Sequence, residues 1–181
     1  MFDKRPILES ERVIVRPLRE EDFAGLYAVA SDPEIWLLHP DRTRYQESVF
    51  RQLFDDSLAS GGAMVVIDKA TGSIIGSSRY NVSDPDSGRA EIGWSFLARS
   101  HWGGSWNREV KHLLLSHAFR FVDVVYFRAG EANLRSRRAM EKIGGRLKEA
   151  TEVIQWPNDR SAVHVFFEIL KADFVAKNAA D

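Results

Sequence analysis

The sequence has 181 residues and no cysteine, and this absence removes several kinds of chemistry at once. Without a thiol, the chain forms no disulfide, no thiolate metal site and no cysteine nucleophile. The absence also fits a reducing compartment, and we therefore expect a cytoplasmic location. Any reaction of this protein must rely on oxygen and nitrogen groups.

The sequence also lacks long apolar runs and an excess of charge of either sign. No stretch approaches the roughly 18 apolar residues of a membrane-spanning helix, and residues 1–10 contain no apolar core of signal-peptide length. The 25 basic and 26 acidic residues leave a net charge of −1, which provides no general field for nucleic acid or an acidic membrane. We expect a soluble protein with neither a nucleic acid nor a membrane as its partner.

Histidines with the spacing of metal ligands are missing too. His112 and His117 lie five positions apart, whereas two zinc ligands on one helix require a spacing of about three or four. His101 falls in a predicted turn rather than beside either of them. We therefore expect no metal site.

The apolar residues that are present follow regular periods. They make up 44% of the chain, which suits one globular domain over residues 1–181, with residues 171–181 as a tail. The periods and turn residues predict strands at 12–18, 63–68, 73–82, 89–97 and 124–129, and two more around 156–159. They predict helices at 20–30 and 45–59, one that opens near Glu109 and extends to Phe121, and a short one from Asn133 to Lys142. The expected fold class is α/β, with a mixed, mostly antiparallel sheet of about six to seven strands and about four helices.

Residues 102–107, Trp-Gly-Gly-Ser-Trp-Asn, are the most informative segment and separate a predicted strand from a long amphipathic helix. Adjacent glycines let a ligand approach the backbone closely, and the first amides of a helix point outward as free donors. Together with the helix dipole, these groups favour a phosphate or pyrophosphate. A plain loop is the alternative, because most glycine turns before helices bind nothing.

Four segments, in this order, point to one family. Residues 12–18 (RVIVRPL) are similar to a first strand written L-x-L-R-P-L, and residues 90–94 (AEIGW) match the fourth strand of the same family. Residues 99–109 (RSHWGGSWNRE) are similar to its pyrophosphate loop, R/Q-x-x-W-G-x-G-x-x-x-E, and residues 133–144 contain its last block. The chain resembles the GCN5-related N-acetyltransferases (GNAT family), in particular the RimJ/RimL-like branch of ribosomal-protein alanine N-acetyltransferases.

This resemblance implies a GNAT-like domain that transfers an acetyl group from acetyl-CoA to a primary amine. The amine, in a small molecule or at a protein amino terminus, would attack the thioester directly in a ternary complex, with acetyl-CoA as co-substrate. Backbone amides at residues 96–98 would hold the pantetheine, provided that the strand splays away from its neighbour. The predicted CoA contacts are Phe96, Leu97, Ala98, Arg99, Trp102, Gly103, Gly104, Ser105, Trp106, Asn107, Asn133 and Ser136. Arg99 or Arg108 would supply charge to the pyrophosphate, or each would be a solvated loop charge.

The sequence departs from the family pattern at two positions that bear on activity. Ser105 replaces the second loop glycine, which narrows the space beside the pyrophosphate, although its hydroxyl could donate a hydrogen bond there. Met140 stands where many members have a tyrosine that protonates the departing thiolate, and methionine cannot do so. The alternative function is therefore a protein that keeps the fold and binds an acyl-CoA or a partner without transfer.

Glu91 is the first catalytic candidate. An amine is protonated at neutral pH, so its attack requires a base, and the developing oxyanion requires a donor. A carboxylate in the cleft beside the glycine turn would serve as that base, whereas the alternative is an exposed strand glutamate paired with Arg79 or Arg89. Strand alternation predicts that Glu91 and Trp94 lie on opposite faces of the sheet.

Ser136 is the second catalytic candidate, one turn into the helix that Asn133 begins. Its hydroxyl could reach the thiolate in place of the missing tyrosine, or it could bond only to its own backbone. Asn133 could likewise hold pantetheine or simply cap the helix. Arg135, Arg137 and Arg138 add a basic cluster on this helix, which would meet the adenosine 3′-phosphate or form a solvated face.

Trp36 and His39, in the segment between the first two predicted helices, are the candidates for contact with the acceptor amine. The alternative for both is ordinary loop packing. The sequence does not select one acceptor among amino acids, polyamines, aminoglycosides and protein amino termini. The near-zero net charge leaves the oligomeric state equally open, with a homodimer as one of the options.

Overall fold

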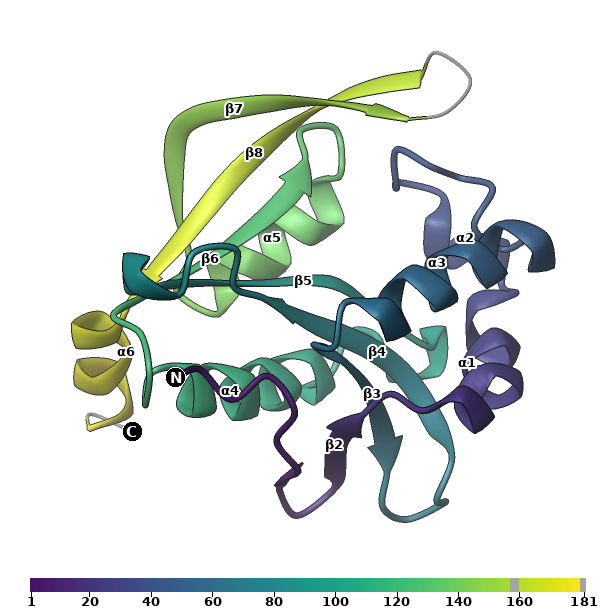
Figure 1. The fold of residues 1–181 in the computed structure, drawn as a ribbon, viewed down its shortest axis with the longest axis horizontal. Helices are drawn as coiled ribbons and strands as arrows, with labels where there is room; N and C mark the ends of the chain where they lie inside the picture. Colours follow the sequence, from purple (N-terminus) through teal and green to yellow (C-terminus); the bar gives the residue numbers. More distant parts are fainter. Residues whose placement is uncertain (157–159, 180–181) are drawn as a thin grey trace.

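The structure, a computed structural model, describes residues 1–156 and 160–179, which form an α/β fold around one sheet (Figure 1). The turn expected at 157–159 lies outside the described residues. The strands are β1 (Leu8–Glu9), β2 (Val13–Pro17), β3 (Ala63–Asp68), β4 (Ile74–Asn81), β5 (Arg89–Leu97), β6 (Val124–Gly130), β7 (Arg146–Trp156) and β8 (Arg160–Leu170). The α-helices are α1 (Phe23–Ala30), α2 (Pro33–Trp36), α3 (Glu47–Ala59), α4 (Trp106–Ala118), α5 (Leu134–Lys142) and α6 (Lys171–Asn178). Short 3-10 helices are η1 (Glu20–Asp22), η2 (Pro85–Ser87) and η3 (Arg99–His101).

The predicted fold class is confirmed. The strand order is β1-β2-β3-β4-β5-β6-β8-β7, and all the neighbours described are antiparallel except β5 and β6. The described part of the chain has eight strands and six α-helices, somewhat more than the sequence suggested. β1 and α2 were not expected, because two and four residues are too few to show a period. Residues 171–178, expected as part of a tail, form α6, whose Phe174 packs against Phe119.

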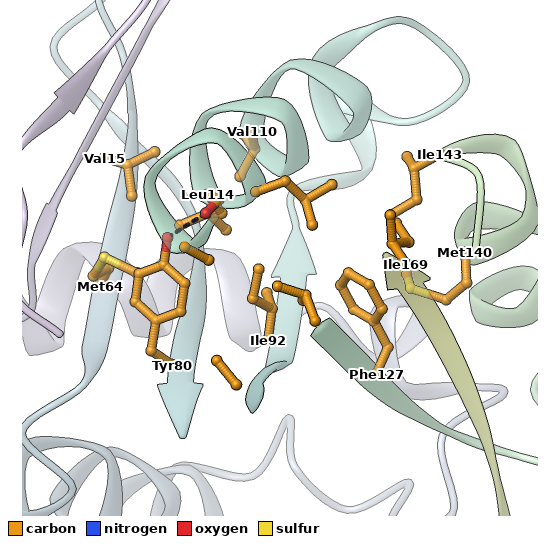
Figure 2. Packing of buried hydrophobic residues seen from close by; sticks show 14 of the residues in the cluster. Val15, Met64, Tyr80, Ile92, Val110, Leu114, Phe127, Met140, Ile143 and Ile169 are labelled. Carbon is orange, nitrogen blue, oxygen red and sulfur yellow. Dashed lines mark hydrogen bonds between the residues drawn. The ribbon is translucent and has the colours of Figure 1, made fainter. Parts of the chain in front are cut away.

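The helices cover both faces of the sheet. On one face, α4 and α5 pack against a core that contains Tyr80, Leu114 and Phe127 (Figure 2). The Tyr80 hydroxyl donates to the Leu114 carbonyl at 2.6 Å, which gives this buried tyrosine a hydrogen-bond partner. On the other face, α1, α2 and α3 bury a second cluster that includes Trp36 and Phe50. Burial of these apolar side chains is the main source of stability.

β5 and β6 separate after a short paired stretch, as Figure 1 allows the reader to follow. Their pairing runs from Arg89 opposite Val124 to Glu91 opposite Tyr126, whereas β5 continues to Leu97 and β6 to Gly130. α4 connects the two strands, which run parallel as such a crossover requires. Beyond this stretch the two strands are not paired, and we call the interval between their unpaired parts, residues 92–97 and 127–130, the opening. The β5 side of the opening ends a few residues before the turn that leads into α4.

A β-bulge in β5 contradicts the predicted alternation of faces. The register between β4 and β5 shifts between Ser77 and Arg79, and Trp94 adopts a φ of 50°. The Trp94 ring consequently packs against the guanidinium of Arg128, which also binds Glu91. Trp94 and Glu91 therefore share a face, and the prediction that they lie on opposite faces is wrong, because a bulge inserts one residue into the strand.

Two predicted helix boundaries also change. α4 begins at Trp106, three residues before Glu109, so the turn is shorter than expected. It ends at Ala118, which leaves Phe121 outside the helix and 39% exposed. α5 agrees with its prediction, with Asn133 as N-cap and Gly144 at a φ of 101° just beyond its end. None of the helices in the described part of the chain combines the length and hydrophobicity that a bilayer span requires.

Candidate active site

Glu91 lies where β5 and β6 separate, and three donors hold its carboxylate. Arg128 of β6 donates from Nε to Oε1 at 2.7 Å and from Nη2 to Oε2 at 3.0 Å, and Asn81 of β4 donates to Oε2 at 3.1 Å. Glu91 is only 2% exposed. The ion-pair partner of Glu91 is thus Arg128, and not Arg79 or Arg89, which the sequence offered as alternatives. The three hydrogen bonds fix the orientation of the carboxylate.

Arg79 and Trp94 extend this cluster. The Arg79 guanidinium lies 3.4 Å from the centre of the Trp94 ring, and its Nε has no hydrogen-bond partner among the described residues. Burial lowers the pKa of Arg79 to about 10, against the opposing charge of Glu91. Trp94 is a non-glycine residue with a positive φ, a local backbone strain of a kind that concentrates at functional sites.

The glycine turn, which the sequence offered as an anion cradle, contains one residue in a backbone conformation that favours glycine. Gly103 has a φ of 77°, and no heavy atom lies within 4 Å of the position that a Cβ would occupy. A side chain at this position would strain the backbone by about 1 kcal/mol and project into the space in front of α4. Gly103, Gly104 and Ser105 are exposed, and the first amides of α4 follow directly.

Contacts with the amino-terminal segment fix the start of α4. Arg12 donates to the Ser105 hydroxyl at 2.7 Å, forms an ion pair with Glu109 and lies 4.6 Å from the Trp106 ring. Partial burial acts to raise the pKa of Glu109, but the hydrogen bonds from Ser10 and Arg12 outweigh it, and the pKa lies below its ordinary value. Ser105 accepts from Arg12 and keeps its own proton to donate.

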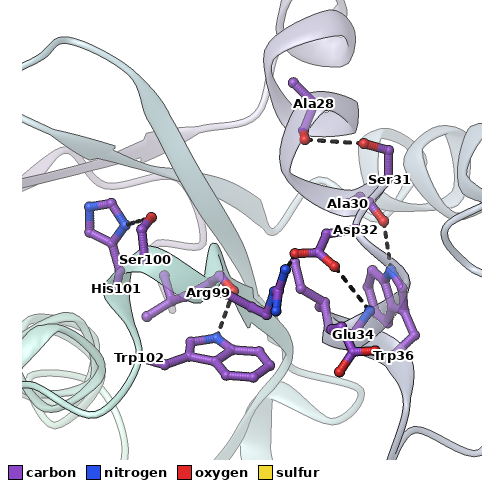
Figure 3. Close-up of polar contacts among 12 residues, drawn as sticks. Ala28, Ala30, Ser31, Asp32, Glu34, Trp36, Arg99, Ser100, His101 and Trp102 are labelled. Carbon is purple, nitrogen blue, oxygen red and sulfur yellow. Dashed lines mark hydrogen bonds and ion pairs between the residues drawn. The ribbon is translucent and has the colours of Figure 1, made fainter.

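The arginines around the turn have different neighbours. Arg99 pairs with Asp32 at 2.5 Å, as Figure 3 shows, so it turns toward the end of α1. Arg135 of α5 lies 4.1 Å from the Trp102 ring and donates to a backbone carbonyl of α2 at 2.6 Å. Arg108 is exposed and has no hydrogen bond or ion pair with another described residue. Of these arginines, Arg108 has the freest guanidinium.

The end of β5 presents one backbone donor to the opening. Ala98 donates its amide to Ile75 of β4 at 2.8 Å, so this group is not available to a ligand. Because successive amides of a strand point to opposite sides, the amide of Leu97 points toward the opening and that of Phe96 points back toward β4. Trp102 donates from Nε1 to the Leu97 carbonyl at 2.9 Å, which ties the turn to the strand (Figure 3).

Asn133 and Ser136 lie at the start of α5, next to the end of β6. The Asn133 Oδ1 accepts from the Ser136 amide at 3.1 Å, which is the N-cap bond of the helix. Asn133 is buried, while Ser136 is half-buried, and its hydroxyl has no hydrogen-bond partner among the described residues. Met140, one turn further on, is buried in the core with Phe127 and Ile143 (Figure 2).

The two predicted acceptor residues have structural contacts. Trp36 is 3% exposed, donates to the Ala30 carbonyl at 2.7 Å and lies 5.0 Å from the Phe96 ring. His39 packs edge-on against Trp36, and burial together with the charge of Arg44 lowers its pKa to about 3. His39 is therefore neutral at physiological pH. Their segment is nonetheless close to the end of β6, because a Cβ on Gly130 would lie 3.0 Å from Pro40.

Two charged residues at the opening were not identified from the sequence. Arg128 follows the buried Phe127 in β6, so strand alternation alone places it on the face of Glu91. Lys111 is buried in α4, and its i, i+3, i+4 spacing with Leu114 and Leu115 was a signal for this position. Within residues 1–156 and 160–179, no group of three or more His, Cys, Asp and Glu side chains is placed to hold a metal ion.

Comparison with known proteins identifies the family. The acetyltransferase (GNAT) domain family matches residues 12–146 of this chain. The chain belongs to the GNAT acetyltransferase family. This assignment confirms the family that the sequence motifs indicated and supports acetyl transfer as the general activity of the enzyme.

Individual relatives of this GNAT protein agree with the family assignment. It is 32% identical over 122 residues to the uncharacterized N-acetyltransferase p20 of Bacillus licheniformis, covering 65% of this chain and 68% of that protein. A GCN5-related N-acetyltransferase from Brucella melitensis has the same fold, with a TM-score of 0.82, 22% identity, and coverage of 97% of this chain and 83% of that chain. The spermidine N-acetyltransferase of Vibrio cholerae, solved with CoA and spermine, gives a TM-score of 0.70 at 16% identity over 92% of this chain and 99% of that chain.

Proposed function

We propose that this GNAT protein transfers the acetyl group of acetyl-CoA to a primary amine by direct attack in a ternary complex. One observation carries the proposal: the opening between β5 and β6 lies beside the Gly103 turn that leads into α4. Unpaired strand amides suit the amide groups of a pantetheine arm, and a helix amino terminus suits a pyrophosphate. Both parts of a CoA molecule would thus find partners at one end of the sheet.

The residues present fit acetyl-CoA, which supplies an activated acyl group as a thioester when bound. The Leu97 amide would hold the pantetheine, and the amides of residues 103–107 together with Arg108 would hold the pyrophosphate. Ser105 would donate its free proton there, and Asn133 keeps its side-chain nitrogen as a donor. The remaining predicted contacts in the loop and strand would shape the site through the protein contacts described above. They are Phe96, Ala98, Arg99, Trp102 and Trp106.

Two roles are open for Glu91, and its surroundings favour the second. As a base, it would take a proton from the attacking amine through water, and its loss would lower kcat by about 100-fold or more. As a positioning group, it would hold β6 against β5 through Arg128 and keep the opening in shape. Three donors on the carboxylate favour positioning, because they occupy three of its roughly four lone-pair sites. Ser136 has a free hydroxyl at the same opening and stays a candidate proton donor.

The acceptor is a primary amine of a small molecule or a protein amino terminus. Trp36 and His39 would contribute shape rather than charge to its site, because Trp36 is buried and His39 is neutral. Assignment to the RimJ/RimL-like branch, a cytoplasmic location and a homodimer are further parts of this proposal, and each rests on the sequence.

The test is a turnover assay that follows release of the CoA thiol from acetyl-CoA. The acceptors are polyamines, amino acids, aminoglycosides and peptides with amino-terminal alanine. Glu91→Gln is compared with Glu149→Gln, a matched change at an exposed residue of β7. We expect transfer to at least one amine by the wild type and by the control. Acetyl-CoA binding without transfer to any amine would contradict the proposal and favour a GNAT-fold protein that binds acyl-CoA or a partner without catalysis.

A further inference from the structure

Lys111 is a buried amine that is hydrogen-bonded to an exposed serine. It lies on α4, is 1% exposed, and donates from Nζ to the Ser95 hydroxyl of β5 at 2.6 Å. Its ammonium also lies 5.4 Å from the ring of Phe127 on β6. The ammonium is thus placed between the two strands at the part of the sheet where they no longer pair. Ser95 is exposed, so its hydroxyl links the buried ammonium to the opening.

The hydrogen bonds around Ser95 leave it with a proton that can move. Its Oγ accepts from Lys111 and contacts the hydroxyl of the fully buried Ser78 at 2.8 Å. Ser95 reaches the Gly93 carbonyl at 3.3 Å, and a carbonyl can only accept, so Ser95 is the donor in that long contact. Ser78 then donates to Ser95. The weakest bond of the network is the one made by the Ser95 proton.

The other ionisable groups near this network are engaged elsewhere. Tyr80 of β4, on the same face, donates to the Leu114 carbonyl. Glu91 and Arg128 pair with each other on the opposite face of the sheet. Within the described residues, no carboxylate forms an ion pair with Lys111. A buried ammonium without a counter-charge is unfavourable, and methionine or leucine at this position of α4 would avoid that cost.

We propose that Lys111, acting through Ser95, supplies the proton for the thiolate of CoA as it departs. This inference rests on the proposed function, and it fills the role left vacant by Met140 with groups from α4 and β5. Met140 and Lys111 both belong to the surroundings of Phe127, so the two helices approach the opening from neighbouring positions.

The amine nitrogen forms a bond to the acyl carbon of the thioester while the C–S bond breaks. The electron pair of the C–S bond goes to sulfur. Ser95 gives its hydroxyl proton to that sulfur, and Lys111 replaces the proton from its ammonium. The attacking nitrogen releases its own surplus proton to water, and the neutral amine of Lys111 regains one from solvent after the products leave.

The acidity of Lys111 suits this transfer. Burial lowers the pKa of Lys111 to about 7. An ordinary thiol has a pKa of about 8.5, so transfer from this ammonium to a thiolate is favourable by about thirtyfold. An exposed lysine, with a pKa of about 10.4, would instead oppose the transfer by nearly a hundredfold.

The test follows the thiol of bound CoA by its thiolate absorbance across pH, with desulfo-CoA as the thiol-free control. The proteins are the wild type, Lys111→Met, Ser95→Ala, Ser95→Thr, Ser136→Ala and, as the matched lysine control, Lys177→Met at an exposed position of α6. Calorimetry with CoA measures binding separately. Urea unfolding shows which variants fold.

In the wild type and Lys177→Met we expect the bound thiol and Lys111 to titrate as a coupled pair, with the midpoint of the thiolate absorbance below that of Lys111→Met, because the thiolate and the ammonium stabilise each other. Lys111→Met should abolish this shift and keep CoA affinity within about threefold, since a methionine fills the same volume. Ser95→Ala should lower kcat by about 100-fold or more with KM for acetyl-CoA retained, and Ser95→Thr should restore most of it.

Unchanged thiol titration in folded, CoA-binding Lys111→Met would overturn the inference while leaving the proposed function intact. Loss of the shift in Ser136→Ala, with none in Lys111→Met, would assign the proton to Ser136 and also overturn it. Failure of the folded wild type to bind CoA would contradict the proposed function and the inference together.

Discussion

Replacing Lys111 with methionine should stabilise the protein, in a way that depends on pH. The pKa of Lys111 is lowered to about 7 in the folded state by burial. In the unfolded chain it returns to about 10.4, so between these values the unfolded state holds a proton that the folded state lacks. The free energy of unfolding of the wild type therefore rises with pH in this window, by up to about 1.4 kcal/mol per unit from this group.

The size of the expected stabilisation follows from the difference between the folded-state and unfolded-state pKa values of Lys111. At pH 7 the lysine lowers the free energy of unfolding by about 4 kcal/mol relative to its value near pH 10.4. The variant loses the hydrogen bond to Ser95, worth about 1 kcal/mol, so the expected net gain is about 3 kcal/mol at pH 7. The gain should shrink toward zero as the pH approaches 10, where the lysine is neutral in the folded state and begins to lose its proton in the unfolded chain as well.

The assay is urea unfolding at pH 7, 8 and 9, followed by the fluorescence of the five tryptophans. Lys177→Met serves as the control, because this lysine is exposed on α6. A gain of about 3 kcal/mol at pH 7 that falls with pH, absent in the control, supports the reasoning. A wild type that is more stable than Lys111→Met at pH 7, or equal pH slopes in the two proteins, would refute it.

Three further changes test the fold and its pH dependence. Tyr80→Phe leaves the buried Leu114 carbonyl without its side-chain partner and should lower the free energy of unfolding by about 1–2 kcal/mol in urea titrations. Gly76→Ala places a Cβ 2.1 Å from the Phe96 carbonyl, so we expect loss of the folded circular dichroism spectrum or a fall of more than about 3 kcal/mol; a folded variant of wild-type stability would contradict the β4–β5 packing. The pKa of His39 is lowered to about 3, so its contribution to stability falls as the pH drops from about 6.5 to 3; His39→Gln should flatten acid unfolding in that range, and an unchanged acid profile would argue against a neutral His39.

Local signals in the sequence were sufficient for most element boundaries. Ala63–Asp68 and Arg89–Leu97 match their predictions at both ends, because glycine and charged turn residues bound them. The helix after Asn133 was equally clear, since the cap residue and the glycines beyond its end act within a few residues of chain. β1, with two residues, carries no such signal.

The details of the opening could not be predicted in the same way. The bulge at Trp94 depends on the register that β5 adopts against β4, and alternation within one strand does not reveal it. The Glu91–Arg128 pair joins two strands separated by α4, so the sequence offered nearer arginines as equal partners. Arg99 was a candidate for the pyrophosphate, and its pairing with Asp32 follows from the position of α1 on the other face of the sheet.

Calorimetric titration with acetyl-CoA is the measurement that tests the central claim most directly. The proteins are the wild type, Gly103→Glu, and Gly88→Glu as the matched control. Gly88 has a φ of 68° and, like Gly103, no heavy atom within 4 Å of its would-be Cβ, but it precedes β5 at the end far from the turn. We predict a Kd on the order of micromolar for the wild type and for Gly88→Glu, and no detectable binding by folded Gly103→Glu. A folded wild type that does not bind acetyl-CoA, or equal binding by Gly103→Glu, would contradict the account.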